Sequence, residues 1–208
     1  ARSFKVKALS DMIIFNIINK CKLSYNNIII NAGGKFIILA PKTSEIKEQL
    51  EIIQKDTDEY FYKEFLGSIS LNLDWSLEIK LNDLDKSNFK NTLEDFFDCL
   101  ELKKKHKFFS LLNNDDNWES NTFKVNEEKI NNEDICDYCH RRLALSDNTC
   151  GSCSEEIKLG KDLPHNNAIL IAEASNSLNC KSYLNINGNY LYLFKDAKKL
   201  SEAKELLI

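Results

Sequence analysis

Two cysteine pairs in the stretch CDYCHRRLALSDNTCGSC, residues 136–153, constrain the fold of this chain more than any other feature. Two residues separate the cysteines of each pair, and ten residues separate the pairs. A two-residue spacing lets a tight turn direct both sulfurs at one metal ion, and a second such turn completes a tetrahedron. Four thiolates leave no coordination position open, and metal binding then stabilises a segment too short to have its own core. The sequence therefore predicts a structural zinc site at Cys136, Cys139, Cys150 and Cys153.

Two disulfides or four free thiols are the alternatives to zinc at this cluster. His140 directly follows a cysteine and is an alternative ligand, but because four cysteines already satisfy the ion, we expect it at the surface. Arg141 and Arg142 place positive charge beside the cluster. They are expected either to be solvated or to contact a phosphate or an acidic partner.

The composition narrows the class of protein. With 208 residues, of which 43% are hydrophobic and 29% charged, the chain is typical of a globular protein with one domain or two small ones. A net charge of -4 does not suggest a nonspecific polyanion binder, and no apolar run reaches the ~18 residues of a membrane span, so we expect no membrane partner. The remaining cysteines lie singly in apolar patterns, which favours a reducing cytoplasmic location over a secreted disulfide scaffold. These are Cys21, Cys99 and Cys180.

Two amphipathic helices are predicted in the first third of the chain. Apolar residues recur at three- or four-residue spacing over residues 3–20, and Ser3 suits the N-cap of this helix. The stripe consists of Phe4, Ala8, Met12, Phe15 and Ile18. After Pro41, either Thr43 or Ser44 can cap a second helix with a similar stripe. That stripe consists of Ile46, Leu50, Ile53 and Phe61.

Strands are predicted between and after these helices. Two runs of β-branched and aromatic residues, 28–30 and 36–39, flank the pair Gly33 and Gly34. This pattern predicts a hairpin with glycines at its turn, and we expect both of its strands to be buried on two faces. Residues 66–79 return to an alternation of apolar and polar side chains, which predicts another strand.

A third helical pattern starts after Ser87, which suits its N-cap, and represents one long helix or two abutting helices. Its inward-facing residues are expected to be Leu93, Phe96, Phe97 and Leu100. The order of helix, hairpin, helix and strand is that of a ferredoxin-like α+β unit, whose first strand would lie upstream of Ala1. We therefore expect a first domain over residues 1–112 that is incomplete at its N-terminus.

A second, smaller domain is predicted over residues 113–208. Its first stretch, residues 113–132, is rich in Asn, Asp and Glu and is predicted as a loop with a short strand. Asn187-Gly188 is a strong two-residue hairpin signal, and Ser201 can cap a short C-terminal helix. Three strands are expected, over residues 168–172, 182–186 and 190–194. The predicted fold class is therefore α+β throughout, with a ferredoxin-like unit followed by a small zinc-bearing α+β domain.

Several stretches of the chain, taken in order, are similar to one family. These are ARSF, NIIINAGGKFIILAP, the Phe96-Phe97 helix with the lysines that follow it, the cysteine stretch, and LGKDLPHNNAILIAEA. Their order and spacing resemble the large signature subunit of type III CRISPR effector complexes, most closely the Csm-type (III-A) version. The similarity is collinear over nearly the whole chain.

This resemblance implies a place within a larger protein. Family members carry an HD-type nuclease domain, a first palm domain like nucleotidyl cyclases, a zinc-bearing connecting domain, a second palm with a GGDD hairpin and a helical C-terminal domain. The chain resembles the first palm, residues 1–112, without its first strand, together with the connecting domain, residues 113–208. The complete subunit is implied to cleave single-stranded DNA and to convert ATP, with magnesium, into cyclic oligoadenylates when guide RNA captures viral transcript. The implied partners are other effector subunits, guide RNA, target RNA and, through the nuclease domain, single-stranded DNA.

The glycine hairpin of this chain lacks the carboxylates of a GGDD hairpin, which bind the divalent metals that align a triphosphate. Lys35 and Phe36 occupy those positions, and neither an ammonium nor a phenyl ring binds magnesium, so no catalytic residue is predicted. Because the two palms of the family share a pocket for two ATP molecules, Gly33, Gly34 and Lys35 are candidate nucleotide contacts, with a plain turn as the alternative. Ser3, in the RSF motif at a helix N-terminus, is a further candidate, with plain capping as the alternative.

Two functional hypotheses follow. In the first, the chain is a scaffold and one half of the ATP pocket of an RNA-guided CRISPR effector subunit. In the second, it is a free-standing zinc-containing module that binds RNA through a basic surface. The residues of that surface would be Lys103, Lys104, Lys105, Lys107, Arg141 and Arg142.

Overall fold

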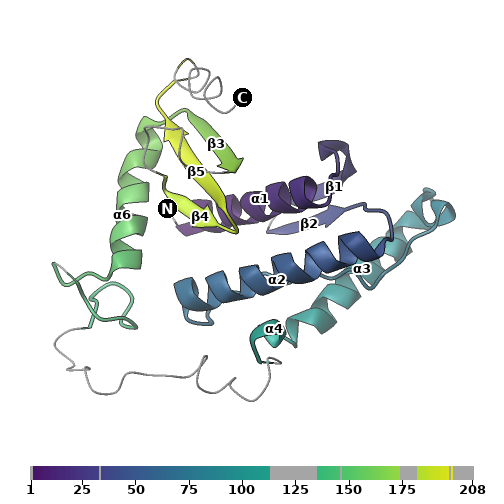
Figure 1. Ribbon diagram of the computed structural model, residues 1–208, viewed down its shortest axis with the longest axis horizontal. Coiled ribbons are helices and arrows are strands. Elements are labelled where there is room, and N and C mark those ends of the chain that lie inside the picture. Colours follow the sequence, from purple (N-terminus) through teal and green to yellow (C-terminus); the bar gives the residue numbers. More distant parts are fainter. Residues whose placement is uncertain are drawn as a thin grey trace. The chain divides into compact units, whose positions relative to one another are not determined.

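The computed structural model describes residues 2–32, 34–112, 135–145, 147–173, 182–196 and 198. Helices and strands are both present in this part of the chain, as Figure 1 shows, which confirms the mixed helix and strand class. Two units make up the chain and are described separately: the first contains residues 1–16 and 123–208, and the second contains residues 17–122. The predicted domain boundary at residue 113 falls where the described residues stop, so it stays a prediction.

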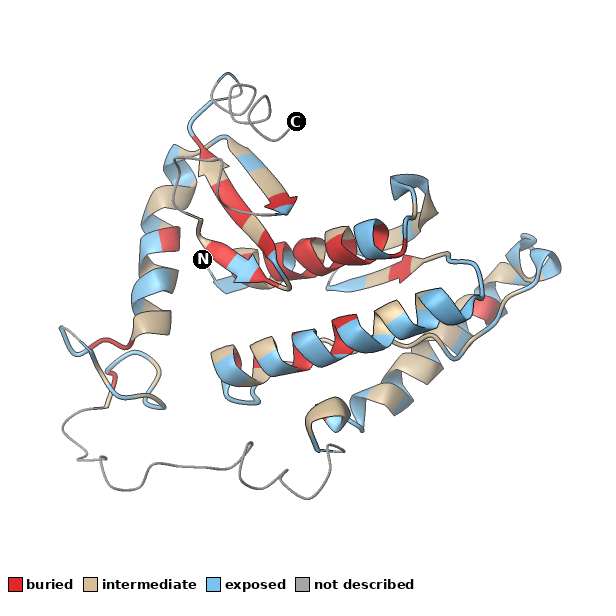
Figure 2. Cartoon of the chain, viewed as in Figure 1, coloured by how far each residue is buried: buried red, intermediate tan, exposed pale blue. Residues whose placement is uncertain are grey.

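The first predicted helix is present as α1, which spans Arg2–Lys20. The single apolar stripe is wrong, because Leu9, Ile13 and Ile17, on the side of the helix away from that stripe, are also buried (Figure 2). The buried face of α1 is therefore much wider than one stripe, and it leaves Lys7 and Asp11 partly exposed on the remaining side. Ser3 lies inside the first turn rather than at the N-cap, because the helix already begins at Arg2.

The glycine hairpin is confirmed, since β1 (Ile28–Ala32) pairs antiparallel with β2 (Lys35–Ile38). Gly34 has a φ of +75°, a conformation that the turn requires and that glycine adopts without steric cost. The expected burial of both strands on two faces is wrong, because Ile37 alone is buried among the described residues of the hairpin. In the described part of the chain these two strands form a sheet by themselves, so no third strand covers their outer edges.

The second predicted helix is present as α2, which spans Ser44–Phe65. Thr43 is its N-cap, one of the two predicted residues, and its side-chain oxygen accepts a hydrogen bond from the Ile46 N–H at 3.3 Å. Ile53 and Phe61 are buried, as the apolar stripe predicts. Capping and periodicity therefore place this helix correctly.

The strand predicted over residues 66–79 is wrong. This segment has no strand partner within the described residues, although Leu73 is buried as the alternation of side chains requires. A side chain of α2 takes the partner's place: the Gln54 amide nitrogen donates to the Leu71 carbonyl oxygen at 3.0 Å, and its amide oxygen accepts from the Leu73 N–H at 2.6 Å. One glutamine thus satisfies the backbone groups that a neighbouring strand would otherwise pair.

The third predicted helix is two helices, α3 (Phe89–Lys104) and α4 (Phe109–Leu112), which agrees with one of the two alternatives. The N-cap is Asn88, because the predicted cap, Ser87, still lies in the turn before the helix. Phe108 separates the two helices with a φ of 56°, which a helix does not accommodate. The residues predicted to face inward are half-buried: Leu93, Phe96, Phe97 and Leu100.

The three strands predicted in the last part of the chain are present as β3 (Ala168–Glu173), β4 (Leu184–Ile186) and β5 (Asn189–Phe194). They form an antiparallel sheet in the order β3-β5-β4. Asn187 and Gly188 form the predicted turn between β4 and β5, with φ values of 52° and 75° that suit a two-residue hairpin.

The central strand β5 is buried on both faces of this sheet. Consecutive residues of a strand point to opposite faces, yet Leu191 and Tyr192 are each 1% exposed. On the Tyr192 face the core also contains Ala172 and Phe194. This sheet is therefore a central part of the first unit.

Two predicted elements, the short strand within residues 113–132 and the helix from Ser201, lie outside the described residues. The described part of the chain contains no helix that is both long and apolar enough to span a membrane. Three short 3-10 helices complete the described elements: η1 (Tyr25–Asn27), η2 (Leu81–Leu84) and η6 (Leu163–His165).

Candidate metal centre

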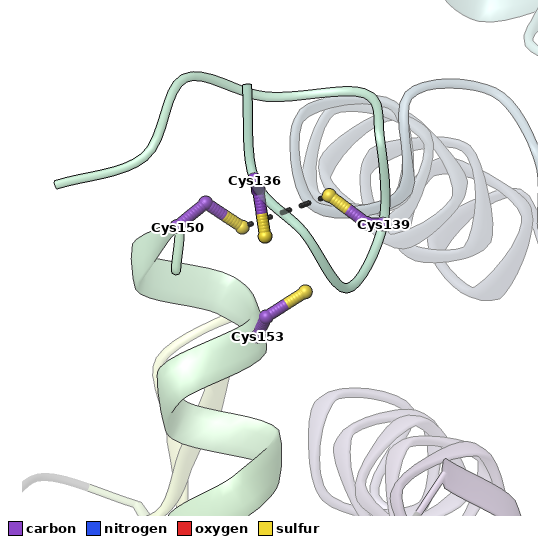
Figure 3. Close-up of side chains that lie close together, drawn as sticks. All are labelled: Cys136, Cys139, Cys150 and Cys153. Atoms are coloured by element: carbon purple, nitrogen blue, oxygen red, sulfur yellow. Dashed lines mark hydrogen bonds between the residues drawn. The ribbon is translucent and has the colours of Figure 1, made fainter. Parts of the chain in front are cut away.

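The first cysteine pair lies in a tight turn that backbone hydrogen bonds close. The Cys136 N–H donates to the Arg142 carbonyl oxygen at 2.8 Å, and the His140 N–H donates to the Cys136 carbonyl oxygen at 2.9 Å. These bonds turn the chain back on itself within a few residues. The side chains of Cys136 and Cys139 therefore point toward the same region (Figure 3).

The second cysteine pair lies at the start of helix α6, which spans Gly151–Asp162. Cys150 is the N-cap of this helix, and Cys153 lies in its first turn. The Asp137 N–H donates to the Asn148 carbonyl oxygen at 2.9 Å and so joins the loop of the first pair to the residues before the second. A turn and a helix N-terminus thus hold the two pairs side by side.

The four sulfur atoms converge on one centre (Figure 3). All four lie within 4.8 Å of one another, and the Sγ atoms of Cys139 and Cys150 are 3.8 Å apart. Four ligands at a Zn–S distance of ~2.3 Å stand ~3.8 Å apart at the corners of a tetrahedron, whereas disulfide sulfurs are ~2.05 Å apart. The cysteines are free, so the arrangement suits one shared metal ion rather than two disulfides.

The electrostatics of the cluster also suit a cation. Burial alone would raise the pKa of the Cys136 thiol, but backbone N–H groups of Cys150, Cys139 and Tyr138 donate to its sulfur and lower its pKa to about 6. Burial raises the pKa of Cys150, although hydrogen bonds from Cys153 lower it in part. Burial, followed by the neighbouring sulfurs, raises the pKa of Cys153. Four sulfurs this close do not all ionise unless a positive charge lies between them, and a bound metal ion supplies that charge.

His140 is exposed and lies outside the group of four sulfurs, as expected. Its φ of 50° is in the left-handed region that favours glycine, so this position serves the turn rather than the metal. Arg141 is exposed beside it, while the main chain of Arg142 closes the turn through the bond to Cys136.

A buried charge pair between α1 and α6 was not predicted from the sequence. Lys5 is 2% exposed, and its Nζ lies 3.8 Å from Oε1 of Glu156. The other oxygen of that carboxylate, Oε2, lies 3.9 Å from Nε of Arg2. One signal was available, because the first turn of α1 has no acidic residue at the place where the helix dipole favours one.

The candidate nucleotide contacts fall in different units. Ser3 is exposed in the first turn of α1 and belongs to the first unit, whereas Gly34 and Lys35 belong to the second. Gly33 lies outside the described residues. A Cβ added to Gly34 would meet no atom within 4 Å, so the space around this turn is open. The structure thus leaves the Gly34 end of the turn accessible to an incoming group.

The Lys35 ammonium lies over an aromatic ring, with Nζ 4.5 Å from the ring centroid of Phe97. Lys103 stands similarly over Trp75 at 5.3 Å, and Lys104 forms an ion pair with a neighbouring glutamate of α3. Both ring distances are those of cation–π contacts. Three lysines around α3 therefore have partners within their own unit.

The fold is similar to that of part of the solved Csm1-Csm4 structures. A solved Csm1-Csm4 subcomplex in the type III-A CRISPR-Csm interference complex is similar over 94% of this chain and 22% of its own, with a TM-score of 0.65 and 18% identity. A Csm1-Csm4 cassette in complex with one ATP is similar over 94% of this chain and 22% of its own, with a TM-score of 0.66 and 16% identity. At these identities the likeness concerns the fold alone.

Residues 1–140 match the model of the family described as Csm1 subunit domain B, and the chain belongs to this family. The resemblance to the large Csm-type subunit is therefore confirmed. A curated relative, the CRISPR system single-strand-specific deoxyribonuclease Cas10/Csm1 (subtype III-A) of Thermococcus onnurineus (strain NA1), is 31% identical over 75 residues. The match covers 36% of this chain and 10% of that protein, so the chain corresponds to a small part of this relative.

Proposed function

We propose that this chain provides a scaffold and one half of an ATP pocket in the large subunit of an RNA-guided type III-A CRISPR antiviral effector. The observation that carries this proposal is the match of residues 1–140 to the Csm1 subunit domain B family. In this proposal, residues 1–112 form a ferredoxin-like palm of the cyclase type and residues 113–208 form the connecting domain. The order of α1, the β1–β2 hairpin and α2 supports the palm assignment.

The complete subunit is proposed to be a single-strand DNase and an ATP-dependent cyclic oligoadenylate synthetase that acts in the cytoplasm. The Thermococcus relative is described as a single-strand-specific deoxyribonuclease, and Csm1-Csm4 cassettes have been solved in complex with one ATP and with cA3. The Csm4 chain in those structures supports other effector subunits as partners. Guide RNA, target RNA and single-stranded DNA are proposed as partners from the family resemblance.

The cysteine cluster is proposed to hold one structural zinc ion. Cys136 and Cys139 would bind it from the turn, and Cys150 and Cys153 from the start of α6. Tetrahedral sets of four thiolates select zinc over oxygen-binding ions such as magnesium. Zinc bound there supplies folding free energy to this segment, and because four protein ligands leave no position open, it takes no part in the reaction.

The glycine hairpin is proposed to contact nucleotide without catalysing the reaction. The open surroundings of Gly34 support close approach of a phosphate to the backbone of the Gly33-Gly34 turn. The contact of Lys35 with Phe97 is worth about 0.5–1 kcal/mol at an exposed site, so the ammonium can leave the ring for a triphosphate. Ser3, in the first turn of α1, is proposed as a second phosphate contact.

Oligoadenylate synthesis by the complete subunit tests this proposal. Because Lys35 would bind ATP but take no part in the chemical step, K35A is expected to raise the KM for ATP roughly tenfold and to change kcat little. The matched control is K47A, because Lys47 is exposed on α2 and pairs only with Glu51 one turn away among its described ion pairs. A KM for K35A equal to that of K47A would show that this lysine does not contact the nucleotide.

The alternative of a free-standing RNA-binding module is less well supported. The family is described as a domain of a subunit, which favours a role inside a larger protein. Two lysines of the basic surface are also engaged within the chain, Lys103 with Trp75 and Lys104 with Glu101.

A further inference from the structure

Helix α1 begins without the counter-charge that a helix N-terminus usually has. The N-terminus of a helix carries a partial positive charge, which acidic residues in the first turn normally offset. The first turn of α1 contains no acidic residue and instead brings Arg2 and Lys5 to this end. The balancing anion comes from another helix, because the carboxylate of Glu156 on α6 lies beside both cations.

The two contacts of Glu156 differ in their exposure to water. The inner one, from Oε1 to Lys5 Nζ at 3.8 Å, joins side chains that are 20% and 2% exposed. The outer one, from Oε2 to Arg2 Nε at 3.9 Å, involves an arginine that is 71% exposed. Charges shielded from water attract each other more strongly than exposed ones. The inner contact with Lys5 therefore contributes most of the attraction between the two helices at this point.

Glu156 shares its helix with the metal centre. Cys150 is the N-cap of α6 and Cys153 lies in its first turn, so a metal ion bound to both sulfurs orders this turn. Glu156 follows Cys153 by three residues, which makes the two side chains neighbours on the helix surface. Ordering the start of α6 therefore also places the Glu156 carboxylate.

We propose that Glu156 is a positioning residue: its carboxylate holds the first turn of α1 against α6, so that metal binding at the four cysteines fixes the helix end that carries Ser3. The part of this inference that concerns Ser3 rests on the proposed function. The coupling between metal and helix does not, because Glu156 contacts both Arg2 and Lys5 without a nucleotide.

Hydrogen exchange with and without zinc tests the coupling in the 208-residue chain. The variant is E156Q, which keeps the size of the side chain and removes its charge. The matched control is E155Q, because Glu155 is the exposed neighbour on the same helix. In the wild type and in E155Q, zinc is expected to slow the exchange of backbone amides in residues 4–9 roughly tenfold, the effect of one partly buried charge at a helix end. In E156Q this zinc effect on α1 is lost, while zinc still slows exchange in residues 151–154.

This design separates positioning from a purely structural role. If the ion pair only stabilises α1, E156Q speeds exchange by the same factor with and without zinc, and the proposal is wrong. The proposal is also wrong if zinc slows α1 exchange in E156Q as much as it does in the wild type. E156D retains a carboxylate and is expected to keep part of the zinc effect on α1. If E156D loses this effect as completely as E156Q, the substitutions disrupt the structure in general, and the proposal is wrong.

Zinc affinity gives a second, independent measurement. Because coupling between two sites is reciprocal, E156Q is expected to weaken zinc binding by the same roughly tenfold factor by which zinc slows α1 exchange. Competition with a chelating dye measures this affinity, and an unchanged affinity in E156Q contradicts the coupling.

ATP binding to the complete subunit separates this inference from the proposed function. If Ser3 contacts the nucleotide, E156Q raises the Kd for ATP, and E155Q leaves it unchanged. If E156Q abolishes the zinc effect on α1 but not ATP binding, the coupling holds and the role of Ser3 in nucleotide binding is wrong.

Discussion

Replacing Asp58 tests whether hydrogen bonding or buried charge dominates within the second unit. Asp58 is 2% exposed in the middle of α2. Its carboxylate accepts hydrogen bonds from the Gln54 amide nitrogen at 2.8 Å and from the Ser110 hydroxyl of α4 at 2.6 Å. Through Gln54 it is also linked to the segment that contains Leu71 and Leu73. Asp58 therefore holds two separate segments against α2.

Two substitutions at this position are expected to differ. D58A removes both acceptors and leaves the Ser110 hydroxyl without its carboxylate, so we expect the free energy of unfolding to fall by about 2–4 kcal/mol. D58N retains both side-chain bonds, because its amide oxygen accepts from Gln54 and its amide nitrogen donates to the Ser110 oxygen, and it loses only the bond that the Ser110 backbone N–H donates to the carboxylate. It also avoids burying a charge, and we expect its stability at pH 7 to equal or exceed that of the wild type.

The pH dependence of the stability difference between the wild type and D58N shows whether the buried charge of Asp58 stabilises or destabilises the fold. Burial raises the pKa of Asp58, more than its hydrogen bonds from Ser110 and Gln54 and the charge of Lys103 lower it. A carboxyl group whose pKa is raised on folding stabilises the fold below its unfolded pKa of ~4, and this contribution is lost as the pH rises through the raised value. Relative to D58N, the wild type is therefore expected to lose stability as the pH rises above about 4.

Urea unfolding followed by tryptophan fluorescence and circular dichroism, at pH 4.5 and pH 7, measures these differences. Comparison with D58N cancels the contributions of other titrating groups. If D58N is as unstable as D58A at pH 7, or if the wild type gains stability over D58N as the pH rises, the reasoning about Asp58 is refuted.

Three further predictions concern the cysteine cluster and the glycine hairpin. Elemental analysis is expected to find one zinc per chain and none in C153S, and a wild-type protein without zinc after preparation in metal-free buffer contradicts the site. H140G is expected to stabilise the zinc-bound chain against urea by about 1 kcal/mol, since glycine adopts the left-handed conformation freely; lower stability would show that His140 has another role. Incubated with ATP and magnesium, this chain alone is expected to form no oligoadenylate on chromatography, and abundant product would overturn the interpretation of Lys35 and Phe36.

Features set by a few adjacent residues could be predicted from the sequence. The turn at Cys136 and Cys139 is closed by a bond between residues only four apart, and the turn at Asn187-Gly188 is equally local. The cap of α2 at Thr43 is equally local. In each case the interacting groups are so close in the chain that no distant contact decides the conformation. The second turn predicted at Cys150 and Cys153 is instead the start of helix α6.

Features that depend on a distant partner could not be predicted. The alternation in residues 66–79 correctly indicates that Leu73 is buried, but the partner of this segment is the side chain of Gln54 instead of a strand. From the sequence, Lys5 is expected to be exposed like most lysines, whereas in the structure it is buried beside Glu156, which lies far away in the sequence. The absence of an acidic residue from the first turn of α1 indicates that an anion is needed there, but it does not indicate which residue supplies that anion.

Helix α6 has a consequence for the order in which this protein folds. The helix has only 12 residues, and isolated helices of this length are marginal in water because their first turn is costly to nucleate. A metal ion shared by Cys150 and Cys153 would act as that nucleus. Asp162, at the other end of α6, can then accept a hydrogen bond from the Tyr183 hydroxyl, at 2.7 Å. The region around α6 would then fold only after the metal ion binds. In a cell that lacks the metal, this region would stay unfolded and open to proteases for longer.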